Sequence, residues 1–292
     1  MPFFHNGDVA IHFHEQGDRG VPIVCIHPPC LSSRLFTYLR TELVDKHRII
    51  TCDIRGHGYS EPGAAKLTLP LVAEDLRRLL DACGVKKSYL CSYGAGSFPL
   101  LTALLAYPDR FCGGIIISGA AAYTDIISRS KLQAAYMTSA LKAKDIIAFS
   151  SALREADNRT AFQALNSDAK QGDPAKWRDY VGACLDETFE RQLPRISLPM
   201  LLVYGTADRA GRVNAEAMHH LLPDSELYGV LKAKHQLLMK EPVKAGLVIG
   251  QWIERHEEPS IADTLEERSE LLQVLAEHGV EGRNEGEAGS RV

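Results

Sequence analysis

A candidate for catalytic chemistry lies in residues 88–97, which read Ser-Tyr-Leu-Cys-Ser-Tyr-Gly-Ala-Gly-Ser. The stretch begins as an apolar strand and ends in a sharp turn of small residues, and the apolar run 98–107 is long enough for a helix. Strand, tight turn and helix form the frame of a nucleophile elbow, in which a G-x-S-x-G turn presents a reactive serine. The frame is present here, but Gly94 stands at the position of the serine.

Two later residues could act together with such a turn. Asp208 follows the apolar run 200–204, and His235 lies in a polar loop before the last predicted helix. A histidine can take a proton as a general base, and a carboxylate can orient its imidazole. Taken singly, Asp208 is more simply a turn residue and His235 a loop histidine. Asp125 is a weaker alternative acid.

The elements that must position these residues alternate along the chain. Continuous apolar runs predict strands buried on both faces, and helical periodicity lies between them. Thr68 is expected to cap one helix and Gly84 to end it. The pattern predicts an α/β fold, a mostly parallel sheet with helices on both faces. Besides the elbow, strands are expected at 9–14 (antiparallel), 21–26, 48–52, 114–118, 200–204 and 226–231, and helices at 35–43, 214–222 and 245–253.

The domain organisation follows from where the strands are missing. Residues 121–198 carry helical stretches without a strand, which predicts an inserted helical cap, named the cap segment below. Residues 1–120 and 199–256 would form the α/β core. The tail 257–292 holds one possible amphipathic helix, suited to docking a partner or to packing on its own domain, and a polar, Gly-rich end that we expect to be disordered.

Composition narrows the function classes. The chain has 292 residues, a formal net charge of −4 and a pI near 6.3, so nucleic acid is not an expected partner. Seven scattered cysteines without a C-x-x-C pair indicate reduced thiols and a cytoplasmic location. Neither a signal peptide nor a membrane span is predicted. No metal or cofactor motif is found, so a small molecule is the expected ligand, and the oligomeric state is left open.

Ordered motifs along the chain resemble the α/β-hydrolase family over residues 3–255. His27-Pro28 stands where the family has His-Gly, and residues 53–62 match its D-x-R-G-x-G-x-S loop. Asp208 and His235 occupy the family positions of the catalytic acid and histidine. The resemblance implies the α/β-hydrolase fold and hydrolysis of a small ester, lactone or related acyl substrate, with His235 as base and Asp208 orienting it.

The elbow departs from the family pattern in one decisive position. Aligned without gaps on the family's G-H-S-x-G-G, Gly94 replaces the nucleophilic serine and Ser92 replaces the first glycine. The nucleophile of an elbow has a positive φ, which glycine adopts freely, so the turn should persist without the serine. Natural loss and an engineered change would both give this sequence. Alternatively, Ser92 is the nucleophile if the strand ends two residues earlier.

The oxyanion hole is also altered. The family uses the backbone N–H after the nucleophile, here that of Ala95, and a second N–H at a position that Pro29 occupies without one. Cys30 could donate instead after a small loop shift. Its thiol is more simply a core or pocket-lining group than a nucleophile. Tyr93, which flanks the elbow, could offer a hydroxyl to the pocket. His27 belongs to the same predicted pocket.

Three functions are compatible with these residues. The first is an acyl hydrolase that has lost covalent serine catalysis. The second is general-base chemistry by His235 and Asp208 without any nucleophile. The third is a non-catalytic ligand-binding or scaffold protein that keeps the pocket.

Overall fold

The computed structural model describes residues 2–124, 126–141 and 143–257. Asp125 and the predicted tail helix therefore lie outside the described residues. Residues 1–252 form one compact unit, within which the site described below lies. Among the described residues, no helix combines the length and apolar character needed to cross a bilayer.

One eight-stranded sheet organises this unit, in the order β1-β2-β4-β3-β5-β6-β7-β8. The strands β1 and β2 pair in antiparallel fashion, as do β2 and β4, and all other neighbours are parallel. The prediction of a mostly parallel α/β sheet is therefore confirmed. The strands are β1 (Phe3–Asn6), β2 (Val9–Gln16), β3 (Ile23–Ile26), β4 (Ile49–Cys52), β5 (Ser88–Tyr93), β6 (Phe111–Ile117), β7 (Met200–Gly205) and β8 (Ser225–Val230).

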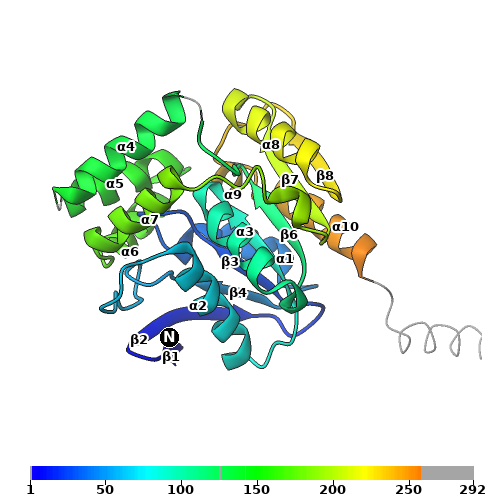
Figure 1. Ribbon diagram of the computed structural model, residues 1–292, viewed down its shortest axis with the longest axis horizontal. Coiled ribbons are helices and arrows are strands. Elements are labelled where there is room, and N and C mark those ends of the chain that lie inside the picture. The colour runs from blue at the N-terminus through cyan, green and yellow to red at the C-terminus, as the bar shows by residue number, and fades with distance from the viewer. Residues whose placement is uncertain (1, 125, 142, 258–292) are drawn as a thin grey trace, which may run out of the picture. The chain divides into compact units, whose positions relative to one another are not determined.

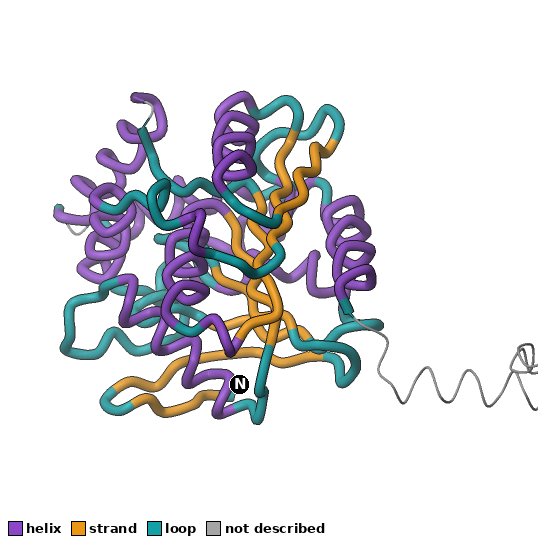
Figure 2. Tube along the Cα trace, turned by 45° about the vertical axis from the view of Figure 1, so that its right-hand side comes forward, coloured by secondary structure: helices purple, strands orange, loops and turns teal. Residues whose placement is uncertain are grey.

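Helices cover the sheet, and in Figure 2 the strands lie between them. Every residue of β3, β4 and β5 is buried, which explains why these strands are mostly apolar without alternating polar positions. The helices are α1 (Thr37–Leu43), α2 (Leu69–Ala82), α3 (Ser97–Ala106), α4 (Ile126–Ala140), α5 (Lys144–Glu155), α6 (Arg159–Ala169), α7 (Pro174–Asp186), α8 (Arg209–Leu221), α9 (Leu237–Lys240) and α10 (Pro242–His256).

Local signals explain where several helices begin and end. The Thr68 hydroxyl accepts a hydrogen bond from the Leu71 N–H, and Gly84 follows α2 with a φ of +67°, as predicted. Helix α8 was predicted to begin at residue 214 but begins at Arg209, because the Asp208 carboxylate already caps it. Helix α10 is also longer than predicted, since Pro242 suits a first helical turn.

One strand that was not predicted lies before the strand predicted at 9–14. Strand β1 precedes it and pairs with β2 through a two-residue turn, in which Gly7 has a φ of +64°. Gly7-Asp8 is a hairpin signal that the sequence contained, since glycine at positive φ suits such turns.

The cap segment contributes helices α4–α7 between β6 and β7, and Figure 1 shows these green helices lying together. Polar contacts tie them to the loops after β3 and β4: the Asp173 N–H donates to the Gly56 carbonyl after β4 at 2.7 Å, and Arg34 after β3 pairs with Asp168 at 2.7 Å. The ring of His57 packs between core and cap, 6.3 Å from that of Trp177. The loop 53–62 is thus a support for these helices.

Candidate active site

The elbow stands at the carboxyl end of β5, next to the middle of the sheet. The strand ends at Tyr93, a single 3₁₀ turn spans Gly94–Gly96, and α3 begins at Ser97. Gly94 has a φ of +54°, the conformation that an elbow requires of its nucleophile position. A Cβ on Gly96 would lie 2.4 Å from the Ile26 carbonyl oxygen, so the elbow touches β3 through bare backbone. The turn therefore forms with glycine at position 94.

Space for a side chain remains at Gly94. A Cβ built there would lie 3.8 Å from Pro28 Cβ and 3.9 Å from His235 Nε2, both ordinary contact distances. The hydroxyl of a serine would extend one bond further, within reach of the imidazole. His235 thus faces the point where a nucleophile would stand.

His235 is oriented by the acid that the sequence predicted for it. Its Nδ1 lies 3.1 Å from Asp208 Oδ2, while Asp208 Oδ1 accepts from the Gly211 N–H at 3.1 Å. The hydrogen bond from His235 lowers the pKa of Asp208, against an opposing effect of burial. With Nδ1–H donating to this carboxylate, the lone pair of Nε2 points toward Gly94. The predicted pair is therefore assembled, in the geometry of a general base.

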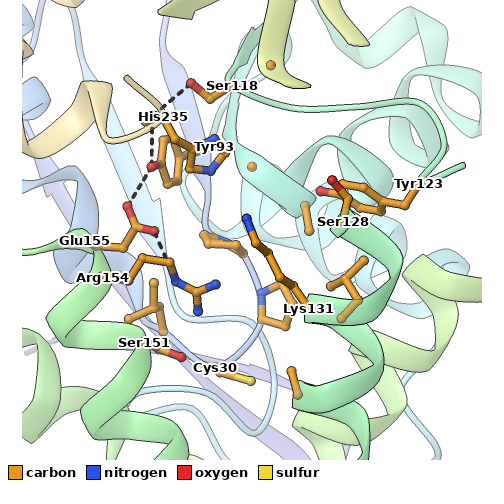
Figure 3. A pocket seen from close by; sticks show the side chains of 18 of the residues that line it. Cys30, Tyr93, Ser118, Tyr123, Ser128, Lys131, Ser151, Arg154, Glu155 and His235 are labelled. Atoms are coloured by element: carbon orange, nitrogen blue, oxygen red, sulfur yellow. Dashed lines mark hydrogen bonds and ion pairs between the residues drawn. The ribbon is translucent and has the colours of Figure 1, made fainter. Parts of the chain in front are cut away.

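The loop of His235 is held by two hydroxyl groups, those of Ser118 and Tyr93 (Figure 3). The hydroxyls of Ser118 and Tyr93 lie 3.0 Å and 3.2 Å from the His235 carbonyl oxygen. Tyr93 also donates to Glu155 Oε2 at 2.6 Å, and burial, with the nearby carboxylate, raises its pKa well above the ordinary value. Tyr93 therefore links the histidine loop to helix α5.

A cavity of about 260 Å³ opens above these groups. Its floor consists of Gly94, Ala95, Asp208 and His235, called the elbow floor below. One face of α4 and one face of α5 form a second side, called the helical wall. The helical wall comprises Ser128, Lys131, Leu132, Ala135, Ser151, Arg154 and Glu155.

The loop after β3 carries three of the predicted site residues, and only two of them line the cavity. Pro29 and Cys30 line the cavity beside Ala95, whose N–H is the candidate oxyanion donor. Burial raises the pKa of the Cys30 thiol to about 12, which argues against a thiolate nucleophile. His27 does not line the cavity, contrary to its predicted place in the pocket. Its Nδ1 lies 2.8 Å from the Pro28 carbonyl and its Nε2 accepts from the Ile54 N–H at 2.9 Å, so it fixes the loop.

Ser92 also lies away from the cavity. It is fully buried in β5, and its hydroxyl donates to the Ile115 carbonyl of β6 at 3.5 Å. The strand continues past it to Tyr93, so the early strand end that would make Ser92 a nucleophile is not observed.

Sequence reasoning missed the helical wall. Its members recur at the spacing of one helix face, 128, 131, 132 and 135 on α4 and 151, 154 and 155 on α5. That spacing could have identified a common face, but not the cavity that the face lines.

Known proteins place this chain in one family. A sequence model of the alpha/beta hydrolase fold matches residues 21–242. Polyketide synthase ThaQ of Burkholderia thailandensis is 26% identical over 77% of this chain, but the match covers only 11% of that synthase. The 3-oxoadipate enol-lactonase 2 of Acinetobacter baylyi is 24% identical over 71% of this chain and 82% of its own length. A thermophilic esterase of Thermogutta terrifontis shares the fold with a TM-score of 0.75, at 21% identity over 86% of this chain and 95% of its own. The chain therefore belongs to the α/β-hydrolase fold family.

Proposed function

We propose that the protein binds a small acyl or related carbonyl compound and acts on it through His235 as a general base, without a covalent acyl-enzyme. The observation that carries this proposal is the open position at Gly94, whose Cβ site lies 3.9 Å from His235 Nε2. Asp208 keeps the imidazole oriented toward that position. The relatives named as an enol-lactonase and an esterase support the class of ligand.

In a hydrolytic reaction, a water molecule would take the place of the serine side chain. His235 Nε2 accepts its proton while the water oxygen attacks the carbonyl carbon, and the Ala95 N–H stabilises the developing oxyanion. Collapse of the tetrahedral intermediate expels the alcohol, which takes the proton back from Nε2. General-base catalysis contributes about 10²- to 10⁴-fold, so turnover should be slow compared with that of a complete triad.

Hydrolysis of p-nitrophenyl acetate and butyrate tests this proposal. The unmodified chain should turn over slowly, lose that turnover in His235→Ala, and form no adduct with a fluorophosphonate serine probe in mass spectrometry. Gly94→Ser should form the adduct and hydrolyse the esters faster. A probe adduct on Ser92 of the unmodified chain, or turnover that survives His235→Ala, would contradict the proposal.

A non-catalytic binding role is the second candidate, and Pro29 favours it. Without an N–H at this position, the site lacks a donor whose loss typically costs about 2.7–4 kcal/mol of transition-state stabilisation. If the unmodified chain and His235→Ala both turned over esters and enolisable ketones only at the background rate, the protein would be assigned the non-catalytic binding role.

A further inference from the structure

The helical wall carries two cations into the cavity. Lys131 extends from α4 and Arg154 from α5, and Figure 3 shows both side chains reaching into the same space in front of Tyr93. The carboxylates of Asp208 and Glu155 also line the cavity, so an anionic ligand is favoured only by the positive charge that these carboxylates leave unengaged.

The acidic groups of the cavity are already engaged by other partners. Asp208 accepts from His235 and Gly211, and Glu155 Oε2 accepts from the Tyr93 hydroxyl at 2.6 Å. Arg154 approaches the other Glu155 oxygen only to 3.9 Å, which is longer than a hydrogen bond.

Lys131 forms no ion pair with any residue in the described part of the chain. Its charge acts on Asp208 only at long range, where it helps to lower the pKa of that carboxyl group. The ammonium group of Lys131 and most of the guanidinium group of Arg154 therefore remain available to bind an incoming ligand. A guanidinium can bind a carboxylate with two parallel hydrogen bonds, and an ammonium adds a point charge.

We propose that Lys131 and Arg154 bind a carboxylate group of the ligand while the ligand's carbonyl carbon lies over Gly94. The position of the carbonyl rests on the function proposed above. The inference narrows the substrate class to small anionic carbonyl compounds, such as acyl compounds with a second, ionised carboxyl group. A cavity of about 260 Å³ restricts them to short chains.

Binding of unreactive keto acids tests this subsite without any need for turnover. The probes are 5-oxohexanoate and 6-oxoheptanoate, each compared with its neutral amide, titrated calorimetrically into the full chain at low salt. At least one acid should bind about tenfold more tightly than its amide, a difference of about 1.4 kcal/mol. Because both cations are partly exposed, added salt should reduce this preference.

Three variants separate the subsite from a general effect of charge. Lys131→Met and Arg154→Met should each weaken binding of the preferred acid about five- to tenfold and leave amide binding within about twofold. Arg159→Met removes a cation from α6 outside the cavity and should change neither. Equal affinity for acids and amides, or an equal loss in Arg159→Met, would overturn the subsite. A failure of ester turnover would instead count against the proposed function alone.

Discussion

The elbow floor and the helical wall face the same cavity but are built by opposite means. Gly94 and Ala95 are buried parts of a turn whose backbone contacts β3, and Asp208 caps a helix directly after β7. The helical wall consists of side chains on one face of two helices, and Lys131 and the Arg154 side chain are exposed. Backbone therefore holds the turn of the elbow floor, whereas the helical wall presents side chains to the cavity.

This difference means that the elbow turn does not depend on the side chain at position 94. The turn is held by strand ends and by the contact of Gly96 with Ile26, not by the side chain at position 94. Replacing a serine by glycine at positive φ even removes strain, on the order of 1–3 kcal/mol. The exposed cations of the helical wall, Lys131 and Arg154, should by contrast be replaceable with little effect on the fold.

The largest expected effect comes from two separate variants, each of which adds one methyl group to one of the two elbow glycines. Gly96→Ala places a Cβ 2.4 Å from the Ile26 carbonyl oxygen, and since backbone cannot easily yield, unfolding free energy should fall by about 3 kcal/mol or more. Gly94→Ala makes only ordinary contacts with Pro28 and His235 and should lose about 1–2 kcal/mol, from its positive φ. Urea denaturation of both variants measures the difference. Equal losses would show that the turn is not held by its contact with β3.

A second prediction concerns the link between floor and wall. Tyr93→Phe leaves the buried Glu155 carboxylate without its 2.6 Å donor and should cost about 1–3 kcal/mol. Adding Glu155→Gln should recover part of that loss, because a neutral amide needs the donor less than a carboxylate does. A double-mutant cycle on the free energy of unfolding measures the coupling. Strictly additive losses would mean that the two residues do not act as a pair.

The sequence predicted the floor well because parallel strands end at a common edge. The elbow follows β5, Asp208 follows β7 and His235 follows β8, so strand assignment alone brings them together. Their roles as base and orienting acid came from the family resemblance, and the 3.1 Å contact between them agrees with those roles.

The wall could not be predicted in the same way. Helical spacing groups Lys131 with Leu132 and Arg154 with Glu155, but it does not reveal which face meets the cavity. The contact between Tyr93 and Glu155 joins residues 62 positions apart, and no local pattern encodes it. His27 was misplaced for a related reason, since its hydrogen bonds to backbone became visible only with the loop in three dimensions.

A third, smaller effect concerns the titration of Asp208. The hydrogen bond from His235 lowers the pKa of Asp208 below its ordinary value of 3.8, so this pair contributes stability above that value and loses it as the pH falls through the folded pKa. In His235→Ala the pKa of Asp208 should rise toward the ordinary value. An NMR titration of the Asp208 carboxyl carbon measures this directly. The stability difference between the two proteins should narrow below about pH 4; a constant difference across this range would contradict the assignment.

The smallest expected effect gives the sharpest contrast with the elbow glycines. Lys131 is exposed and forms no ion pair with a described residue, so Lys131→Met should change the free energy of unfolding by no more than about 0.5 kcal/mol. The same substitution should weaken binding of the keto acid, whereas Gly94→Ala should cost stability because of its backbone. If Lys131→Met instead destabilised the fold as much as Gly94→Ala, the helical wall would be part of the framework, and the division between a fixed floor and a replaceable wall would fail.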